Sequence, residues 1–181
     1  IVRRDAGCRG VRGLRVGGMR GGWARGGGGG GDLHLVAANF GVRFRRMDLG
    51  RHPAVAAHAH HVINTSLATS IGTNGTTVST IEHLMAALYA SCIDNVLIEL
   101  DGPEVPIFDG SAGPFLDIIR EAGIKELSVH RQCMIITRPI LLREGDAFVK
   151  ATPGEHFQVR YTIDFPHPLV GKQTLLWSYN E

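Results

Sequence analysis

The sequence predicts an α+β protein, in which runs of strands and individual helices form separate layers. Of its 181 residues, 44% are hydrophobic, which is enough to fill a core. Several short segments alternate apolar and polar residues, whereas two segments repeat with the period of a helix. The order is strands, helix, strand, helix and a second run of strands. Such segregated runs favour an α+β architecture over a doubly wound parallel sheet.

The beginning of the chain differs in composition from the rest. Residues 1–31 contain seven arginines, one acid and thirteen of the 24 glycines, with no strand or helix period. Glycine at this density makes ordering of the backbone costly for so little apolar burial. We therefore predict a mostly disordered or aberrant tail at 1–32, a first α+β domain at 33–127 and an incomplete second one at 128–181.

Three segments of the predicted first domain carry strand signals. Apolar and polar side chains alternate in 39–49, and 61–71 is β-branched and rich in Thr and Ser. The second of these strands leads into Asn74 and Gly75, a pair that supplies the positive φ of a tight hairpin. The short, nearly continuous apolar run at 95–100 predicts a buried strand.

Two segments predict helices. The stretch "STIEHLMAAL" at 79–88 has helical spacing of its apolar residues, and the stripe consists of Ile81, Leu84, Met85 and Leu88. A second helix begins near Pro114, which suits a first turn, and Gly123 closes it in the left-handed conformation. The prolines and glycines of "DGPEVPIFDGSAGP", which precedes this helix, exclude regular structure.

After about residue 127 the pattern restarts as strands. The segments are "QCMIITRPILLR", then "AFVKATP" after a turn at "EGD", and finally "FQVRYTIDF" with clean alternation. No helical pattern follows them. We therefore expect a sheet that no helix of this chain covers.

Composition excludes several classes of function. The net charge of +2 comes from the arginine-rich tail, so the rest of the chain gives no electrostatic reason to expect nucleic acid as a partner. No apolar run approaches the roughly 18–20 residues of a membrane span. With no secretory signal pattern, we expect no stable membrane insertion and a cytoplasmic protein. Three cysteines without C-x-x-C spacing predict reduced thiols. The oligomeric state stays open.

Glu82 and His83 are adjacent in the first turn of the predicted helix, and two interpretations are open. In one, Ser79 caps the helix, Glu82 completes a capping box and His83 lies on the surface; spacing alone favours this. In the other, His83 binds a metal through a neutral imidazole while Glu82 takes a proton from the attacking water, the chemistry of amide or ester hydrolysis. A catalytic zinc needs three protein ligands, and the sequence does not complete the set.

A dense histidine cluster, "HAHH" at 58–61, is another candidate for metal binding. A strand would place His58 and His60 on one face, and imidazole binds zinc, copper and nickel. This pattern predicts at most a weak surface site.

Four stretches together resemble one family: "INTSLATSI", "VSTIEHLMAALYASCIDNVLIEL", "GPEVPIFDGSAGPF" and "YTIDFPHPL". In this order they resemble the N-terminal half of UDP-3-O-acyl-N-acetylglucosamine deacetylase, the zinc amidase of lipid A synthesis in Gram-negative bacteria. The resemblance runs from about Ala38 to the end. It implies two α+β domains with the active site between them, a Zn²⁺ cofactor and a UDP-linked acylated amino sugar as substrate.

The resemblance also implies roles for individual residues. His83 is expected to be a zinc ligand and Glu82 the general base. Substrate contacts are expected from a "TxLxT" strand near the acyl chain and from an "IDF" segment near the sugar nucleotide, which here are Thr65, Leu67, Ala68, Thr69, Asp164 and Phe165. The family's other zinc ligands and its catalytic acid lie beyond this chain, so we expect the 181 residues alone to be inactive.

The sequence departs from the family at its beginning, where the Arg/Gly stretch replaces a strand pair with a "GVGLHSG"-like motif. A reading-frame error upstream of about Leu33 is one hypothesis for this. Two rival functions stay open. One is a non-catalytic sugar-nucleotide or lipid-binding module with a structural Glu-His pair, and the other is nucleic-acid binding through the Arg/Gly tail.

Overall fold

The computed structural model describes residues 2–14 and 30–178. It divides into two compact units. We call Arg9–Arg131 the helical unit, and Ile1–Cys8 together with Gln132–Glu181 the hairpin unit. Sheets and helices are segregated along the chain, so the predicted α+β class is confirmed. None of the helices in the described ranges has the length and apolar character that crossing a membrane requires.

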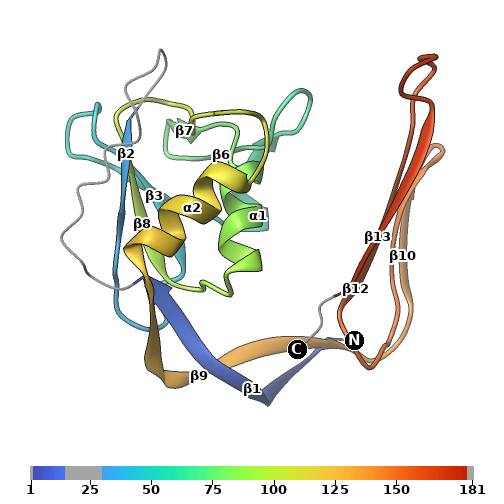
Figure 1. Cartoon of the computed structure of the whole chain (residues 1–181), viewed down its shortest axis with the longest axis horizontal. Helices are drawn as coiled ribbons and strands as arrows, with labels where there is room; N and C mark the ends of the chain where they lie inside the picture. Colours follow the sequence, from blue (N-terminus) through green and yellow to red (C-terminus); the bar gives the residue numbers. More distant parts are fainter. Residues whose placement is uncertain (1, 15–29, 179–181) are drawn as a thin grey trace. The chain divides into compact units, whose positions relative to one another are not determined.

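A four-stranded sheet forms one layer of the helical unit, and two helices cover one of its faces (Figure 1). Its strand order is β2-β8-β3-β4, with β8 parallel to β3 and antiparallel to β2. The strands are β2 (Gly31–His34), β3 (Val42–Arg46), β4 (Ala54–Ala56) and β8 (Val96–Leu100). The helices are α1 (Glu82–Ala90) and α2 (Gly113–Ala122), which contact each other. The predicted strands at 39–49 and 95–100 are thus confirmed as the shorter β3 and β8.

The core lies between this sheet and the helices. Many of its largest fully buried side chains come from β3, β8, α1 and α2, and include Phe44, Ile98, Leu84, Leu88, Phe115 and Ile119, while Ile71 of a neighbouring strand is also fully buried. The predicted stripe of α1 is confirmed, because Ile81, Leu84 and Leu88 are buried and the partly buried Met85 packs against the core. At the end of α2, Gly123 has the predicted positive φ of 78°. Its ψ of 162° is extended rather than left-handed helical, a combination that favours glycine.

A three-stranded sheet consists of β5 (Val62–Asn64), β6 (Ser70–Thr73) and β7 (Thr76–Val78). The hairpin between β6 and β7 has φ of 50° at Asn74 and 79° at Gly75, which confirms the predicted turn. The single strand predicted over 61–71 is wrong, because the chain reverses between β5 and β6 and the two pair antiparallel. Asn64 Oδ1 accepts a hydrogen bond from the Ser66 N–H at 3.0 Å, a local turn that competes with a continuous strand.

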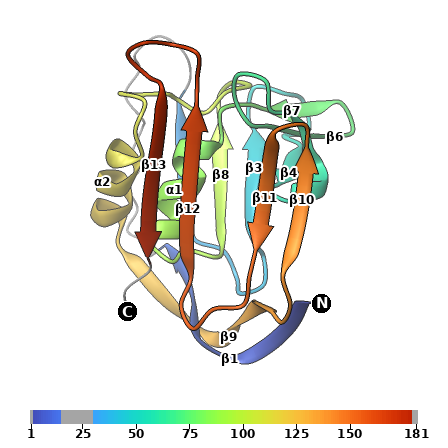
Figure 2. The same ribbon diagram turned by 90° about the vertical axis from the view of Figure 1, so that its right-hand side faces the viewer.

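The hairpin unit contains two antiparallel strand pairs (Figure 2). One joins β10 (Ile140–Glu144) to β11 (Ala147–Ala151), and the other joins β12 (Gln158–Asp164) to β13 (Lys172–Ser178). The strands predicted at "AFVKATP" and "FQVRYTIDF" are confirmed as β11 and β12, and β13 is an additional one. The single strand predicted at "QCMIITRPILLR" is wrong, because residues 137–139 interrupt it and only β10 continues after them. Many large apolar side chains are exposed, among them Leu141, Leu142, Phe148, Val149, Tyr161, Leu175 and Leu176.

Strand β1 (Val2–Leu14) pairs with β9 (Ile124–Ile136) in a two-stranded sheet. The sequence predicts no regular element in the first of these segments. Pairing with another strand gives backbone N–H and C=O groups their partners whatever the side chains are, so a strand forms without an apolar pattern. Residues 15–29 of the predicted tail lie outside the described ranges, and residues 30–32 lead into and begin β2.

Candidate active site

Glu82 begins helix α1 and is connected to the segment before β6. Its Oε2 accepts a hydrogen bond from the backbone N–H of Thr69 at 3.0 Å. The Ile81 N–H donates in turn to the Thr69 carbonyl at 3.3 Å. Glu82 is partly buried, so this charge-assisted bond limits the orientations of its carboxylate. The structure therefore brings two predicted site residues, Glu82 and Thr69, into direct contact.

The capping box predicted for this helix is wrong. The residue that caps α1 is Ile81, and no side chain makes a capping hydrogen bond. Ser79 Oγ bonds instead with Ser70 Oγ at 2.9 Å, and Thr80 Oγ1 donates to Glu104 Oε1 at 2.6 Å. These tertiary partners take the hydroxyls that a local cap would have used, and Glu82 is left to bind Thr69.

The loop that follows β8 is attached to the chain just before α1. The Ser79 N–H donates to the Pro103 carbonyl at 2.8 Å, and the Val105 N–H donates to the Ser79 carbonyl at 3.1 Å. Together they form a parallel bridge between Ser79 and Glu104. The segment "DGPEVPIFDGSAGP" is therefore held against the beginning of α1, although it contains no strand or helix before α2.

His83 follows Glu82 on α1 and is partly buried. The pKa of Asp109 is lowered from its ordinary value, first by hydrogen bonds from the Ser111 backbone N–H at 2.9 Å and hydroxyl at 2.8 Å, and to a smaller extent by the charge of His83. Asp109 thus lies within electrostatic range of the imidazole. Its bonds to Ser111 agree with the local role that the sequence predicts.

The electrostatic interaction of Asp109 with His83 is a feature that sequence reasoning missed. The two residues are on different elements, and neither periodicity nor spacing connects the loop to the first turn of α1. The available signal was the presence of both "STIEHL" and "DGSAGPF" among the stretches of the family resemblance. The shared presence of these stretches shows that both belong to one family pattern, but it does not indicate how close Asp109 and His83 are in space.

The remaining predicted substrate residues lie in two places. Thr65 and Leu67 are exposed and Ala68 is partly buried, in the bend between β5 and β6 rather than in a strand. The Leu67 side chain is fully solvent-accessible, with a relative exposure of 101%. Asp164 ends β12 in the hairpin unit, 3.9 Å from Lys172 Nζ, and the exposed Phe165 follows it. Their substrate contacts stay predictions.

The histidine cluster at 58–61 is not a strand. Residues Ala59–His61 form a 3₁₀ turn in which the His58 and His60 rings stack, with centroids 4.9 Å apart. His58 Nδ1 accepts a hydrogen bond from the His60 N–H at 3.2 Å, which occupies one ligand atom. Within the described part of the chain, neither this cluster nor His83 belongs to a group of three ligand side chains that could enclose an ion.

Comparison with known families assigns the chain. The model of the UDP-3-O-acyl N-acetylglycosamine deacetylase (LpxC) family matches residues 31–181. The chain belongs to this family. It is 46% identical over 142 residues to UDP-3-O-acyl-N-acetylglucosamine deacetylase of Myxococcus xanthus, which covers 78% of this chain and 45% of the relative.

Two other relatives match this chain with similar identity and coverage. The deacetylase of Geotalea uraniireducens is 42% identical over 78% of this chain and 46% of its own length. That of Thermosynechococcus vestitus is 43% identical over 82% of this chain and 52% of its own length. The chain therefore spans about half the length of the curated relatives that it matches.

Proposed function

We propose that this chain provides the Glu82 and His83 portion of the active site of a zinc-dependent deacetylase. The substrate would be UDP-3-O-acyl-N-acetylglucosamine, and the reaction a step of lipid A synthesis in the cytoplasm. Family membership and the names of the relatives support the reaction class. The observation that carries the residue assignment is the Thr69 N–H that holds Glu82 in place beside His83.

His83 fits the zinc site as one ligand of several. Its imidazole is partly buried at the beginning of α1, with the Asp109 carboxylate within electrostatic range. A catalytic zinc takes three protein ligands, and no set of three around His83 exists among the described residues. We therefore propose that the other ligands come from the part of the family that this sequence does not span.

Glu82 is the proposed general base. When bound, zinc supplies Lewis acidity to the acetamide carbonyl and to the attacking water. Glu82 takes the proton of that water as the water oxygen bonds to the carbonyl carbon, and the C–N bond then breaks. The leaving amine needs a proton from a separate acid, which we place outside this chain. The Thr69 hydrogen bond engages one carboxylate oxygen, and a carboxylate has a second oxygen for the proton.

The substrate-binding part of the proposal concerns two exposed groups of residues. We propose that the bend of Thr65, Leu67 and Ala68 lies along the acyl chain, because a fully exposed leucine beside the Glu82 partner Thr69 offers an apolar contact. Asp164 and Phe165 would contact the sugar nucleotide, with the exposed ring of Phe165 stacking on a base or sugar face.

A chimera tests the proposal, with residues 31–181 replacing the matching half of the Myxococcus xanthus relative. We expect deacetylation by the chimera, measured as release of acetate. Glu82→Gln should lower kcat by about 10²- to 10⁴-fold while zinc is retained. His83→Ala should lose zinc and activity together. As a matched control, Glu121→Gln removes an exposed carboxylate of α2 and should leave both unchanged.

The same experiment separates catalysis from a purely structural Glu-His pair, the alternative of a non-catalytic binding module. The Glu82 hydrogen bond to Thr69 is expected under that alternative as well, since it has a structural function by itself. Glutamine keeps a side-chain oxygen that accepts from Thr69 but is no base. If Glu82→Gln is fully active and only Glu82→Ala is impaired, Glu82 acts as a structural residue and the proposed base is wrong.

A further inference from the structure

A second group of ligand side chains lies on the four-stranded sheet of the helical unit. Asp32 and His34 of β2 and Glu99 of β8 have ligand atoms that all lie within 4.8 Å of one another. In β8, Glu99 stands between the buried Ile98 and Leu100, which belong to the core. Side chains alternate between the faces of a strand, so this group lies on the face opposite the core and α1.

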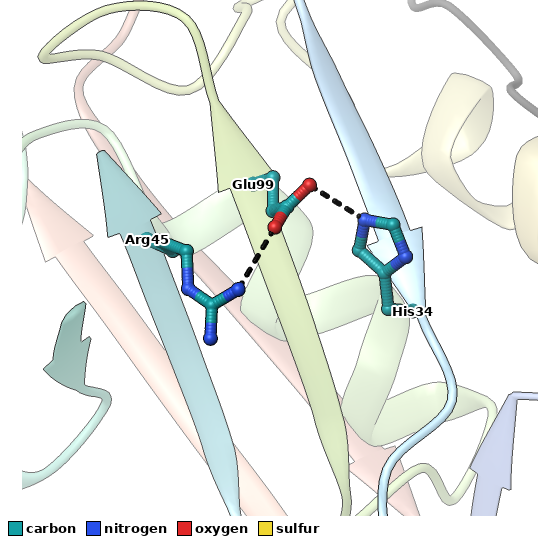
Figure 3. Close-up of polar contacts among 3 residues, drawn as sticks. All are labelled: His34, Arg45 and Glu99. Carbon is teal, nitrogen blue, oxygen red and sulfur yellow. Dashed lines mark hydrogen bonds and ion pairs between the residues drawn. The ribbon is translucent and has the colours of Figure 1, made fainter. Parts of the chain in front are cut away.

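The sheet fixes these three side chains relative to one another. Asp32 and Glu99 are directly opposite in the antiparallel pair of β2 and β8, and His34 is two residues from Asp32 on the same side. His34 Nε2 lies 2.9 Å from Glu99 Oε2, and Arg45 of β3 donates to Glu99 Oε1 at 3.0 Å (Figure 3). Figure 3 shows the Glu99 carboxylate between the two other side chains, on three adjacent strands.

The charges of this group are incompletely balanced. Two carboxylates directly opposite each other repel, and Arg45 contacts one of them. Asp32 Oδ1 is buried and has no hydrogen-bond partner among the described residues. A buried carboxylate oxygen without a partner is unfavourable. One basic side chain, Arg45, thus contacts one of the two carboxylates and leaves Asp32 without a cationic partner among the described residues, so an additional cation at Asp32 would be stabilising.

We propose that Asp32, His34 and Glu99 form a site for a divalent transition-metal ion of the zinc class, separate from the ion expected at His83. One imidazole nitrogen and two carboxylate oxygens suit zinc and its neighbours, whereas magnesium and calcium prefer oxygen ligands alone. The ion would replace the hydrogen bond between His34 Nε2 and Glu99 Oε2, and both atoms would coordinate the ion instead. His34 is exposed, so water completes the coordination.

The position of the site predicts a structural effect. The ion would connect β2, an edge strand of the sheet, to β8, which β3 and β2 flank. An ion that binds the folded chain and not the unfolded chain raises stability in proportion to its occupancy. Zinc should therefore raise the thermal midpoint of the protein even when the proposed active-site ligand is absent.

The test uses the 181-residue chain with His83→Ala, which removes the ligand assigned to the active site. Titration calorimetry with Zn²⁺ should show binding of a single ion, and the thermal midpoint should rise with Zn²⁺ but little with Mg²⁺. Adding His34→Ala should weaken Zn²⁺ binding by about tenfold or more and remove the zinc-dependent rise of the thermal midpoint. Asp32→Asn in the same chain should also weaken Zn²⁺ binding and remove the rise in the thermal midpoint. Without zinc, its thermal midpoint should equal or exceed that of the His83→Ala chain, because the repulsion between Asp32 and Glu99 is relieved.

The control is His60→Ala in the same His83→Ala chain, an exposed histidine outside the group. It should change neither zinc affinity nor the midpoint. The proposal is wrong if the His83→Ala chain shows no zinc-dependent rise, or if His60→Ala rather than His34→Ala abolishes it. Because every variant lacks His83, these results do not depend on whether the proposed deacetylase activity is correct.

Discussion

The helical unit and the hairpin unit have similar sequence patterns and opposite burial. In β3 and β8 the alternating or continuous apolar residues are covered by α1 and α2, so that Phe44 and Ile98 are completely buried. Strands β10 to β13 also contain alternating or contiguous apolar residues, yet Leu142, Phe148 and Leu175 are largely exposed. The difference teaches that alternation sets which side chains share a face, whereas only a second layer removes that face from water.

Polar interactions differ between the units in the same way. In the helical unit, the buried Arg46 guanidinium binds both carboxylate oxygens of Asp48 at 2.7 and 2.6 Å and donates to the Thr77 carbonyl at 2.7 Å. In the hairpin unit, the Lys172 and Asp164 side chains are mostly exposed and 3.9 Å apart. A bidentate pair with a buried guanidinium contributes more to stability than a pair in which both side chains are exposed, which contributes little.

The largest expected effect is in the core of the helical unit. Phe44→Ala removes a fully buried ring and should lower the free energy of unfolding by about 3–5 kcal/mol. Urea denaturation followed by circular dichroism measures this. The matched control is Phe148→Ala in the hairpin unit, where the ring is 60% exposed and the loss should be below about 1 kcal/mol. Equal losses would show that the hairpin face is covered in solution, and the comparison would fail.

An intermediate effect is expected at the Arg46–Asp48 pair. Asp48→Asn leaves Arg46, which is 7% exposed, without its charged partner and should cost about 1–3 kcal/mol at neutral pH. The pKa of Asp48 is lowered in the folded state, first by the hydrogen bonds from Arg46 and then by its charge. The pair therefore contributes its full stabilisation at pH values above the ordinary aspartate pKa of 3.8. This stabilisation is lost as the pH falls below 3.8 and through the lower pKa that Asp48 has in the folded state.

The pH dependence gives the pair a specific test. Urea denaturation of both proteins at a series of pH values should show the difference between wild type and Asp48→Asn shrinking as the solution becomes acidic. Asp117→Asn is the control, because the Asp117 and Arg120 side chains are about three-quarters exposed and their pair should contribute little at any pH. A difference that stays constant down to acidic pH would mean that the ion pair does not stabilise the fold.

The smallest effect is expected on the exposed face of the hairpin unit. Leu175→Thr changes a side chain that is 67% exposed on β13 and should alter the free energy of unfolding by less than about 0.5 kcal/mol. The same substitution at Leu97 of β8, which is 7% exposed, should cost several times more. Denaturation of the two variants side by side measures the ratio, and similar values would contradict the difference in burial.

Much of the fold could be predicted from local patterns. The stripe of α1, the Asn74–Gly75 turn and the buried strand β8 follow from period and turn chemistry, and the structure confirms them. The strand predicted over 61–71 failed because a side-chain turn at Asn64 and the pairing of β5 with β6 overrode its β-branched composition. Strand β1 formed without any apolar pattern, since backbone pairing alone gives a strand its hydrogen bonds.

The residues of the candidate site are a prediction from the sequence, whereas their geometry comes from the structure alone. Glu82 and His83 were identified by the resemblance, while spacing alone favoured a capping box. The structure replaces that box with the hydrogen bond between Glu82 and Thr69, and it brings Asp109 within electrostatic range of His83. Contacts between residues so far apart in sequence depend on how the loop after β8 attaches to Ser79, which no local pattern encodes.

By itself, the sequence determined the α+β class, the face that α1 buries and the family, because these depend on side-chain period and on the order of residues. Only the tertiary structure decided which hydroxyls and amides bind one another around Glu82, and that Asp32, His34 and Glu99 meet on one face of a sheet. The physical reason is that strand pairing sets the register between distant segments, and a shift of one residue would move each of these side chains to the opposite face.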